Sequence, residues 1–239
     1  MSEEEELEVT RETALITGAS RGIGRATALR LAMEYDVVAV ARSEEELDAL
    51  AAEIGELGGR CRTITLDITD ARAVAEALAD VDADVLVNNA GVMTQKPFLE
   101  LTPEEWHRMV DVNFNALYHV TRAVLSGMVE RGRGHVVMVG SIAGRSAFVG
   151  GTCYAATKHA VMGFSESLLF EVRDRGVKVS VVNPGSVDTS LNPKEPGVDA
   201  SWKLTAADVA ECIAQVLDTP PEVLQFAVEV RALRKAGKR

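Results

Sequence analysis

The sequence predicts one α/β domain built around a doubly wound parallel sheet. Short apolar segments of strand length alternate with amphipathic segments of helix length along the 239 residues, and this alternation is typical of parallel strands joined by helices. No repeat, linker or shift in composition divides the chain. We therefore expect a single domain at 12–230, preceded by a disordered acidic N-terminus at 1–11 and followed by a basic tail at 231–239.

Charge and composition exclude several classes of function. The net charge of −11 argues against nucleic-acid binding, because phosphate recognition needs concentrated Lys and Arg. No apolar run approaches the roughly 20 residues that span a bilayer, and the N-terminus is acidic where a signal peptide is basic. The three cysteines and four histidines show no metal-ligand spacing, so we expect no metal site and no disulfide framework. These features predict a cytoplasmic protein without membrane or nucleic-acid partners.

The first predicted strand, 13–17, leads into a glycine-rich turn and then an amphipathic helix. Gly18 permits the tight turn, Gly22 lets the backbone approach a pyrophosphate, and Gly24 lets the helix pack closely on the strand. The phosphates would lie at the helix N-terminus, where free N–H groups and the helix dipole favour anions. The alternative is a glycine-rich connection that binds no ligand.

The next two strands each end in a charged residue. The strand at 36–41 is followed by Arg42 and by a helix that begins with a capping box at 43–46. The strand at 60–66 is followed by Asp67. This carboxylate could hydrogen-bond an adenine, or it could cap the turn before the helix that starts near residue 70.

The fourth strand, 83–87, ends in Asn88, Asn89, Ala90 and Gly91. Small polar residues at the carboxyl end of a strand suit the place where open α/β sheets bind ligands. A long helix should then run from Thr102 to about Val129, because a proline and two glutamates follow the capping threonine.

Asn113 lies inside that long helix, where asparagine has a low helix propensity. A buried asparagine needs hydrogen-bond partners. Asn113 is therefore either a structural hydrogen-bonding residue or part of a proton relay.

The strand at 134–140 ends at Ser141, and a helix with Tyr154 and Lys158 follows. Residues four apart share one face of a helix, so the phenol and the ammonium can act on one bound molecule. A phenol has a pKa near ~10, and a fixed cation nearby favours the phenolate. Ser141 would hold a substrate oxygen beside the phenol. In the alternative interpretation, Tyr154 caps the helix and Lys158 is a solvated lysine.

The C-terminal part begins with a strand at 177–182, followed by Asn183, Pro184 and Gly185. The loop 186–204, which contains Val187 and Thr189, is long enough for an active-site lid. A capped helix at 205–217 and a last strand at 223–230 complete the expected elements.

Five separated signatures together resemble the short-chain dehydrogenase/reductase family, and the likeness covers 13–230. They are Thr17-Gly18-Ala19-Ser20-Arg21-Gly22-Ile23-Gly24, then Asn88-Asn89-Ala90-Gly91, Ser141, Tyr154 with Lys158, and Pro184-Gly185 followed by Thr189. The chain is most similar to small bacterial-type carbonyl or oxoacyl reductases. Its C-terminal third differs from them, which leaves the substrate open.

The resemblance implies a Rossmann-type parallel sheet of about seven strands and a nicotinamide dinucleotide. It implies Tyr154 as general acid/base, Lys158 as the group that lowers the phenol pKa and binds the nicotinamide ribose, Ser141 as the group that orients the substrate oxygen, and Asn113 as the holder of a relay water. The cofactor-binding residues it implies, besides Tyr154 and Lys158, are Gly18, Ser20, Arg21, Gly22, Ile23, Gly24, Arg42, Asp67, Ile68, Asn89, Ala90, Gly91, Pro184, Gly185, Val187 and Thr189.

The end of the second strand predicts which dinucleotide is used. An acid at this place would accept hydrogen bonds from the ribose 2′-hydroxyl and repel a 2′-phosphate. Here that acid is absent, and Arg42 and Arg21 can both pair with a phosphate. This favours NADP(H) over NAD(H), unless Arg42 is only a solvated residue at the strand end.

The sequence thus predicts an NADP-dependent oxidoreductase that transfers a hydride between nicotinamide and a carbonyl or secondary-alcohol substrate. We also expect a homo-oligomer, a tetramer or a dimer, because the two long helices carry more apolar positions than one sheet face covers. The alternative is a catalytically silent dinucleotide-binding regulatory or scaffold protein. Sugar-nucleotide epimerase chemistry is disfavoured, because too few residues follow 182 for a second substrate domain.

Overall fold

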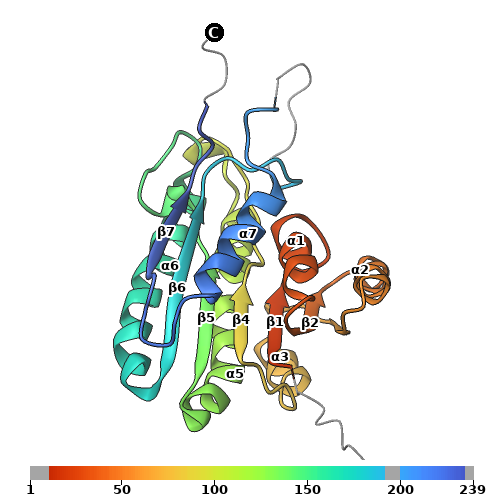
Figure 1. The fold of residues 1–239 in the computed structure, drawn as a ribbon. Coiled ribbons are helices and arrows are strands. Elements are labelled where there is room, and N and C mark those ends of the chain that lie inside the picture. Colours follow the sequence, from red (N-terminus) through yellow and green to blue (C-terminus); the bar gives the residue numbers. More distant parts are fainter. Residues whose placement is uncertain (1–10, 192–199, 235–239) are drawn as a thin grey trace, which may run out of the picture.

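The computed structural model describes residues 11–191 and 200–234 (Figure 1). Three regions with sequence-based expectations therefore lie wholly or partly outside the described residues. They are the acidic N-terminus at 1–10, the centre of the expected lid at 192–199, and the end of the basic tail at 235–239.

The centre of the fold is a parallel sheet, as the sequence predicted. Within the described ranges it has seven strands in the order β3-β2-β1-β4-β5-β6-β7. Strand order reverses direction between β1 and β4, and ligands bind at such switch points in open α/β sheets. The strands are β1 Thr13–Thr17, β2 Asp36–Ala41, β3 Cys61–Thr65, β4 Val85–Asn88, β5 Gly134–Val139, β6 Val177–Pro184 and β7 Ala227–Val230.

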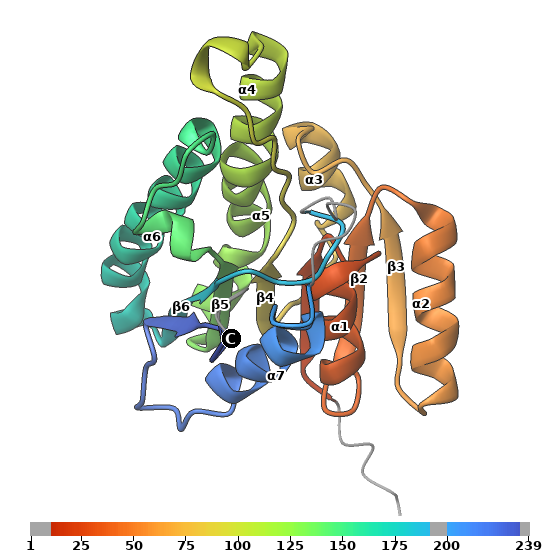
Figure 2. The same ribbon diagram turned by 90° about the horizontal axis from the view of Figure 1, so that it is seen from above.

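Helices cover both faces of this sheet (Figures 1 and 2). α1, α2 and α7 contribute buried side chains to the core on one face, whereas α3, α5 and α6 contribute to the core on the other. α4 packs against α6 beside the second core. The helices are α1 Gly22–Leu31, α2 Glu44–Glu56, α3 Ala71–Ala77, α4 Pro103–Val110, α5 Ala116–Arg131, α6 Thr152–Val172 and α7 Ala206–Leu217.

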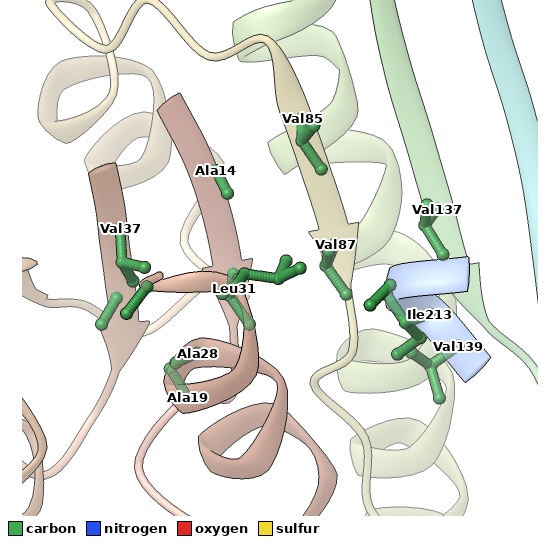
Figure 3. Close-up of a cluster of buried hydrophobic side chains, with 14 of the residues drawn as sticks. Ala14, Ala19, Ala28, Leu31, Val37, Val85, Val87, Val137, Val139 and Ile213 are labelled. Carbon is green, nitrogen blue, oxygen red and sulfur yellow. The ribbon is translucent and has the colours of Figure 1, made fainter. Parts of the chain in front are cut away.

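The continuous apolar runs of the central strands fill both cores, because successive side chains of a strand point to opposite faces. In β4, Val87 packs with the α1 and α7 side, and Leu86 with the α5 and α6 side. Figure 3 shows the first of these cores, where Leu31 of α1 and Ile213 of α7 lie against valines of the central strands. These layers hold the carboxyl ends of the strands in fixed positions.

Two elements differ from the sequence-based expectation. The expected helix from Thr102 to about Val129 is divided into α4 and α5 by a π-helical turn at Asp111–Asn115. The last strand starts at Ala227 rather than at residue 223. The Val223 N–H donates to the Pro220 carbonyl in a turn, so the chain joins the sheet only after this turn.

In the part of the chain that the structure describes, no helix is both long and apolar enough to cross a membrane.

Candidate active site

A cavity of about 1250 Å³ lies at the carboxyl ends of the central strands. Ser141, Tyr154 and Lys158, predicted as catalytic, all line it. Two predicted site residues, Asn113 and Gly24, lie behind its wall. The predicted cofactor-binding residues that line it are Gly18, Ser20, Arg21, Gly22, Ile23, Arg42, Asp67, Ile68, Asn89, Ala90, Gly91, Pro184, Gly185, Val187 and Thr189.

The glycine-rich turn has the geometry that its spacing predicted. Gly18 and Gly22 have φ values of 65° and 56°, a left-handed conformation that side chains with a Cβ rarely adopt. A Cβ on Gly24 would lie 2.2 Å from the Gly18 carbonyl oxygen, so only glycine lets α1 approach β1 this closely. Thr189 lies over Gly22, since its methyl carbon would be 3.5 Å from a Cβ there.

Thr17 joins this turn to the end of β4, a role that the sequence analysis missed. Its Oγ1 accepts hydrogen bonds from the backbone N–H of Asn89 (3.0 Å) and of Ala90 (3.2 Å). The Asn89 side-chain amide donates in return to the carbonyl oxygens of Thr17 (2.9 Å) and Gly18 (3.2 Å). A polar residue ending an otherwise apolar strand was the available signal.

Two guanidinium groups lie on the cavity wall near the end of β2. Arg21 and Arg42 are both exposed, and neither forms an ion pair with another described residue. The glutamates after Arg42 belong to the first turn of α2, where Ser43 accepts a hydrogen bond from the Glu46 N–H at 3.4 Å. Both arginines therefore remain available to an anionic ligand.

Asp67 caps a turn, which was one of its two predicted roles. Its Oδ1 accepts from the Thr69 N–H (3.0 Å) and from the Thr69 hydroxyl (2.8 Å). These two bonds, with a smaller contribution from Arg42, lower the pKa of Asp67. The carboxylate still lines the cavity, so its contact with adenine stays a prediction.

Tyr154 and Lys158 lie one turn apart on α6, and both are buried, with 7% and 5% of their surface exposed. Lys158 Nζ donates to the Val139 carbonyl at 2.8 Å and lies 5.8 Å from the centre of the Tyr154 ring. Burial lowers the pKa of Lys158 to about 8. These positions contradict the alternative in which Lys158 is a solvated lysine.

The pKa of Tyr154 moves in the direction opposite to the one expected from the sequence. Burial raises it, and a hydrogen bond with Ser141 offsets part of that rise. Desolvation disfavours a phenolate, and this effect outweighs the hydrogen bond with Ser141. The lowering of this pKa by Lys158 stays a prediction.

Asn113 is held by its neighbours in the π-helical turn. Its Oδ1 accepts from the Val92 N–H (2.8 Å), and its Nδ2 donates to the Val92 carbonyl (2.9 Å) and to Thr157 Oγ1 (3.2 Å). The structural role is thus observed. A Cβ on Gly91 would lie 3.4 Å from Asn113 Oδ1 and 4.0 Å from Lys158 Nζ, so both side chains lie beside Gly91.

Phe148 is a second site residue that the sequence analysis missed. Its ring centre lies 6.4 Å from that of Tyr154 at an interplanar angle of 62°, and it lines the cavity. A Cβ on Gly151 would lie 2.5 Å from this ring, so the glycine makes room for it. The loop is fixed by a hydrogen bond from the Lys96 N–H to the Gly150 carbonyl (3.0 Å). No periodic pattern marks such a residue.

Comparison with known proteins shows which family this chain resembles. The family description "short chain dehydrogenase" matches residues 12–197. The NADP-dependent 3-hydroxy acid dehydrogenase YdfG of Salmonella typhi is 36% identical over 233 residues, which cover 90% of this chain and 93% of that protein. The 3-oxoacyl-acyl-carrier-protein reductase FabG of Haemophilus influenzae is 36% identical over 184 residues, covering 74% of this chain and 75% of that protein.

A similar fold has been solved for the alcohol dehydrogenase of the archaeon Thermococcus sibiricus complexed with 5-hydroxy-NADP. Its TM-score is 0.88 at 30% sequence identity, and the match covers 96% of this chain and all of that one, 100%.

Proposed function

Because the chain belongs to the short-chain dehydrogenase/reductase family, we propose that it is an NADP(H)-dependent oxidoreductase that interconverts a carbonyl group and a secondary alcohol. One observation carries this proposal. Ser141, Tyr154 and Lys158 meet in the same cavity as a glycine-rich turn and two exposed arginines. A proton-transfer site and an anion site thus share one cavity.

Tyr154 is the residue that exchanges a proton with the substrate oxygen. Its raised pKa keeps the phenol protonated at neutral pH, and this form can donate a proton when a carbonyl is reduced. In alcohol oxidation the same group has to accept the proton. Oxidation is therefore favoured at higher pH.

Ser141 is able to donate a hydrogen bond into the cavity. Its Oγ already accepts from the Ala143 N–H at 3.1 Å, which fixes the oxygen while leaving the hydroxyl proton free. The hydroxyl can donate its hydrogen bond to the substrate oxygen or to the phenolate of Tyr154. Either bond stabilises negative charge that develops on oxygen.

Lys158 has hydrogen-bonding capacity left over. An ammonium has three donors, and the only acceptor found for it among the described residues is the Val139 carbonyl. The remaining donors suit the hydroxyl groups of a ribose. The positive charge of Lys158 beside Tyr154 also favours the phenolate form during turnover.

The dinucleotide fits the residues that are present. Gly18, before α1, and Gly22, its first residue, are left-handed and leave room for phosphates at the helix N-terminus. Arg21 and Arg42 suit a 2′-phosphate. When bound, nicotinamide supplies or accepts the hydride. The relatives named above include an NADP-dependent dehydrogenase and a complex with an NADP derivative, which supports NADP(H) as the cofactor.

A screen of the purified protein against carbonyl compounds tests this function. NADPH consumption is followed by its absorbance, and Tyr154→Phe serves as the inactive control. Turnover by wild type alone supports the proposal. NADPH binding without turnover of any carbonyl or alcohol would favour the silent dinucleotide-binding protein. The proposal includes a cytoplasmic location and a homo-oligomeric assembly.

A further inference from the structure

Asn183 lies at the end of β6, directly before Pro184, and is fully buried at 0% exposure. It is not among the residues that line the cavity. Its side chain faces the end of β5, the strand that leads into Ser141. A buried amide at this place needs partners, because an unpaired buried polar group is costly.

The partner of Asn183 is the backbone of Ser141. Asn183 Oδ1 accepts the hydrogen bond of the Ser141 N–H at 3.1 Å. The last backbone hydrogen bond along this edge comes from Gly140, directly after β5, whose N–H donates to the Val182 carbonyl at 2.8 Å. Pro184 has no N–H to continue the ladder. The side chain of Asn183 thus holds the chain one residue beyond the point where the sheet hydrogen bonds stop.

Gly140 makes this hydrogen bond possible. A Cβ on Gly140 would lie 2.2 Å from Asn183 Oδ1 and 2.9 Å from Val181 Cγ1. The amide therefore occupies the space that a side chain at position 140 would need. Any larger residue there has to displace Asn183 from Ser141.

The other end of the amide reaches the helix that carries Tyr154 and Lys158. Asn183 Nδ2 lies 3.6 Å from the sulfur of Met162, which is one turn beyond Lys158 on α6. Met162 is itself confined, since a Cβ on Gly144 would lie 3.3 Å from its Cγ. One side chain thus contacts both the strand end at Ser141 and helix α6.

We propose that Asn183 is a positioning residue that sets the place of the Ser141 hydroxyl relative to Tyr154 by holding the Ser141 backbone N–H. This inference rests on the proposed oxidoreductase function. It adds a residue outside the cavity whose effect on the reaction passes through Ser141. Asn183→Ala should lower kcat/KM for the carbonyl about 10- to 100-fold, the usual cost of a misplaced reacting group.

The experiment compares wild type, Asn183→Ala, Asn183→Asp and Ser180→Ala. Aspartate has an acceptor oxygen in the same place in its side chain. Asn183→Asp should therefore keep the hydrogen bond from the Ser141 N–H and most of the activity. Ser180→Ala is the matched control, because it removes a buried hydrogen bond of the same strand, between Ser180 Oγ and His135 Nε2 at 2.8 Å, without touching Ser141. Hydrogen exchange of the segment 140–144, NADPH affinity and steady-state kinetics are measured for each protein.

We expect Asn183→Ala to speed exchange in this segment and lower kcat/KM, with NADPH affinity within about 2-fold of wild type. The pH profile of alcohol oxidation should move to higher pH, because the misplaced Ser141 no longer stabilises the Tyr154 phenolate. Unchanged exchange, or an activity loss no greater than that of Ser180→Ala, would overturn the proposal. If Asn183→Ala does not fold, increased exchange in Asn183→Asp would overturn it, and retained protection would support it.

Wild-type turnover tests the proposed function separately from the role of Asn183. If wild type turns over no carbonyl or alcohol, the oxidoreductase assignment fails. The exchange of the segment 140–144 still decides whether Asn183 holds Ser141.

Discussion

Lys158 Nζ lies 5.8 Å from the centre of the Tyr154 ring while donating a hydrogen bond to the Val139 carbonyl at 2.8 Å. The ammonium is thus fixed to the end of β5 and not directly to the phenol. Burial raises the pKa of Tyr154 and lowers that of Lys158 to about 8. Proton exchange by Tyr154 therefore depends on groups that contact its oxygen as well as on the cation.

Tyr154→Phe should remove turnover while leaving NADPH binding nearly intact. The change deletes the hydroxyl that exchanges the proton and keeps the ring that packs against Phe148. We expect kcat to fall at least about 100-fold, since general acid–base catalysis contributes roughly 10²–10⁴-fold. Kinetics and fluorescence titration with NADPH measure the two effects. Tyr118→Phe, on the exposed surface of α5, is the control, and an active Tyr154→Phe would refute the assignment.

Lys158 should make the stability of the protein depend on pH. Its pKa falls from 10.5 to about 8 on folding, so the unfolded state binds more protons between these values. The cost of the buried charge is therefore fully present below pH 8, and it is relieved as the pH rises from about 8 to 10.5.

Lys158→Met tests this dependence, because methionine fills the site without a charge. The stability of the variant relative to wild type should drop by about 2 kcal/mol between pH 7 and pH 9.5. The variant also loses the hydrogen bond to the Val139 carbonyl. The free energy of that loss is the same at both pH values, so it does not contribute to the change between them. Urea denaturation at the two pH values measures the free energies of unfolding. A constant difference would show that Lys158 does not change protonation in this range.

Phe148 should set a preference for substrates with an apolar group beside the carbonyl. Its ring, 38% exposed, lines the cavity next to Tyr154. Phe148→Ala should lower kcat/KM for bulky apolar ketones about 10-fold relative to small ones, since a hydrophobic contact discriminates by roughly 1–3 kcal/mol. Val149→Ala is the control, because Val149 is 90% exposed. An equal loss for small and bulky ketones would contradict this role.

Most of the fold and much of the site could be predicted because they rest on local rules. Apolar runs ending in Gly18 or Gly91 fix the strands and the turns that follow them, and the Tyr154–Lys158 spacing fixes a helix face. What the sequence does not show depends on contacts between distant segments. Asn183 reaches Ser141 across 42 residues, and Phe148 is a site residue only because its loop folds over Tyr154.

The shift of the Tyr154 pKa was misjudged for a related reason. Its direction depends on how deeply α6 buries the phenol, and spacing along a helix does not reveal burial. The π-helical turn was missed because it is stabilised by the bonds of Asn113 to Val92 and Thr157, not by a local sequence preference.

The outer surfaces of α5 and α6 should form the contact between subunits. Tyr118 on α5 and Phe170 on α6 are 46% and 58% exposed, and association would remove their apolar surface from water. Light scattering should give a dimer or tetramer mass at micromolar concentration. Phe170→Asp should lower that mass, whereas Leu57→Asp, an equally exposed apolar position (52%) after α2, should not. A monomeric wild type would refute the assembly.

The choice of dinucleotide should depend on Arg42 and Arg21. Ala41 occupies the end of β2 where an acid would select NAD(H), and both guanidinium groups are exposed on the cavity wall. If each phosphate contact contributes roughly 1.5–3 kcal/mol, wild type should prefer NADPH over NADH by about 10- to 1000-fold in kcat/KM. Equal or better use of NADH by wild type would show that neither arginine binds a 2′-phosphate.

The double variant Ala41→Asp/Arg42→Ser should reverse this preference, because it supplies an acceptor for the 2′-hydroxyl and removes a phosphate partner. Arg42→Ser alone should weaken the use of NADPH and leave that of NADH nearly unchanged. Arg72→Ser is the matched control, since Arg72 is an exposed arginine on α3 paired with Glu76 and away from the cavity. Steady-state kinetics with both reduced dinucleotides, at fixed substrate and ionic strength, give the ratios. If the NADPH-to-NADH ratio of kcat/KM were the same in the double variant as in Arg72→Ser, the 2′-phosphate would have to bind elsewhere.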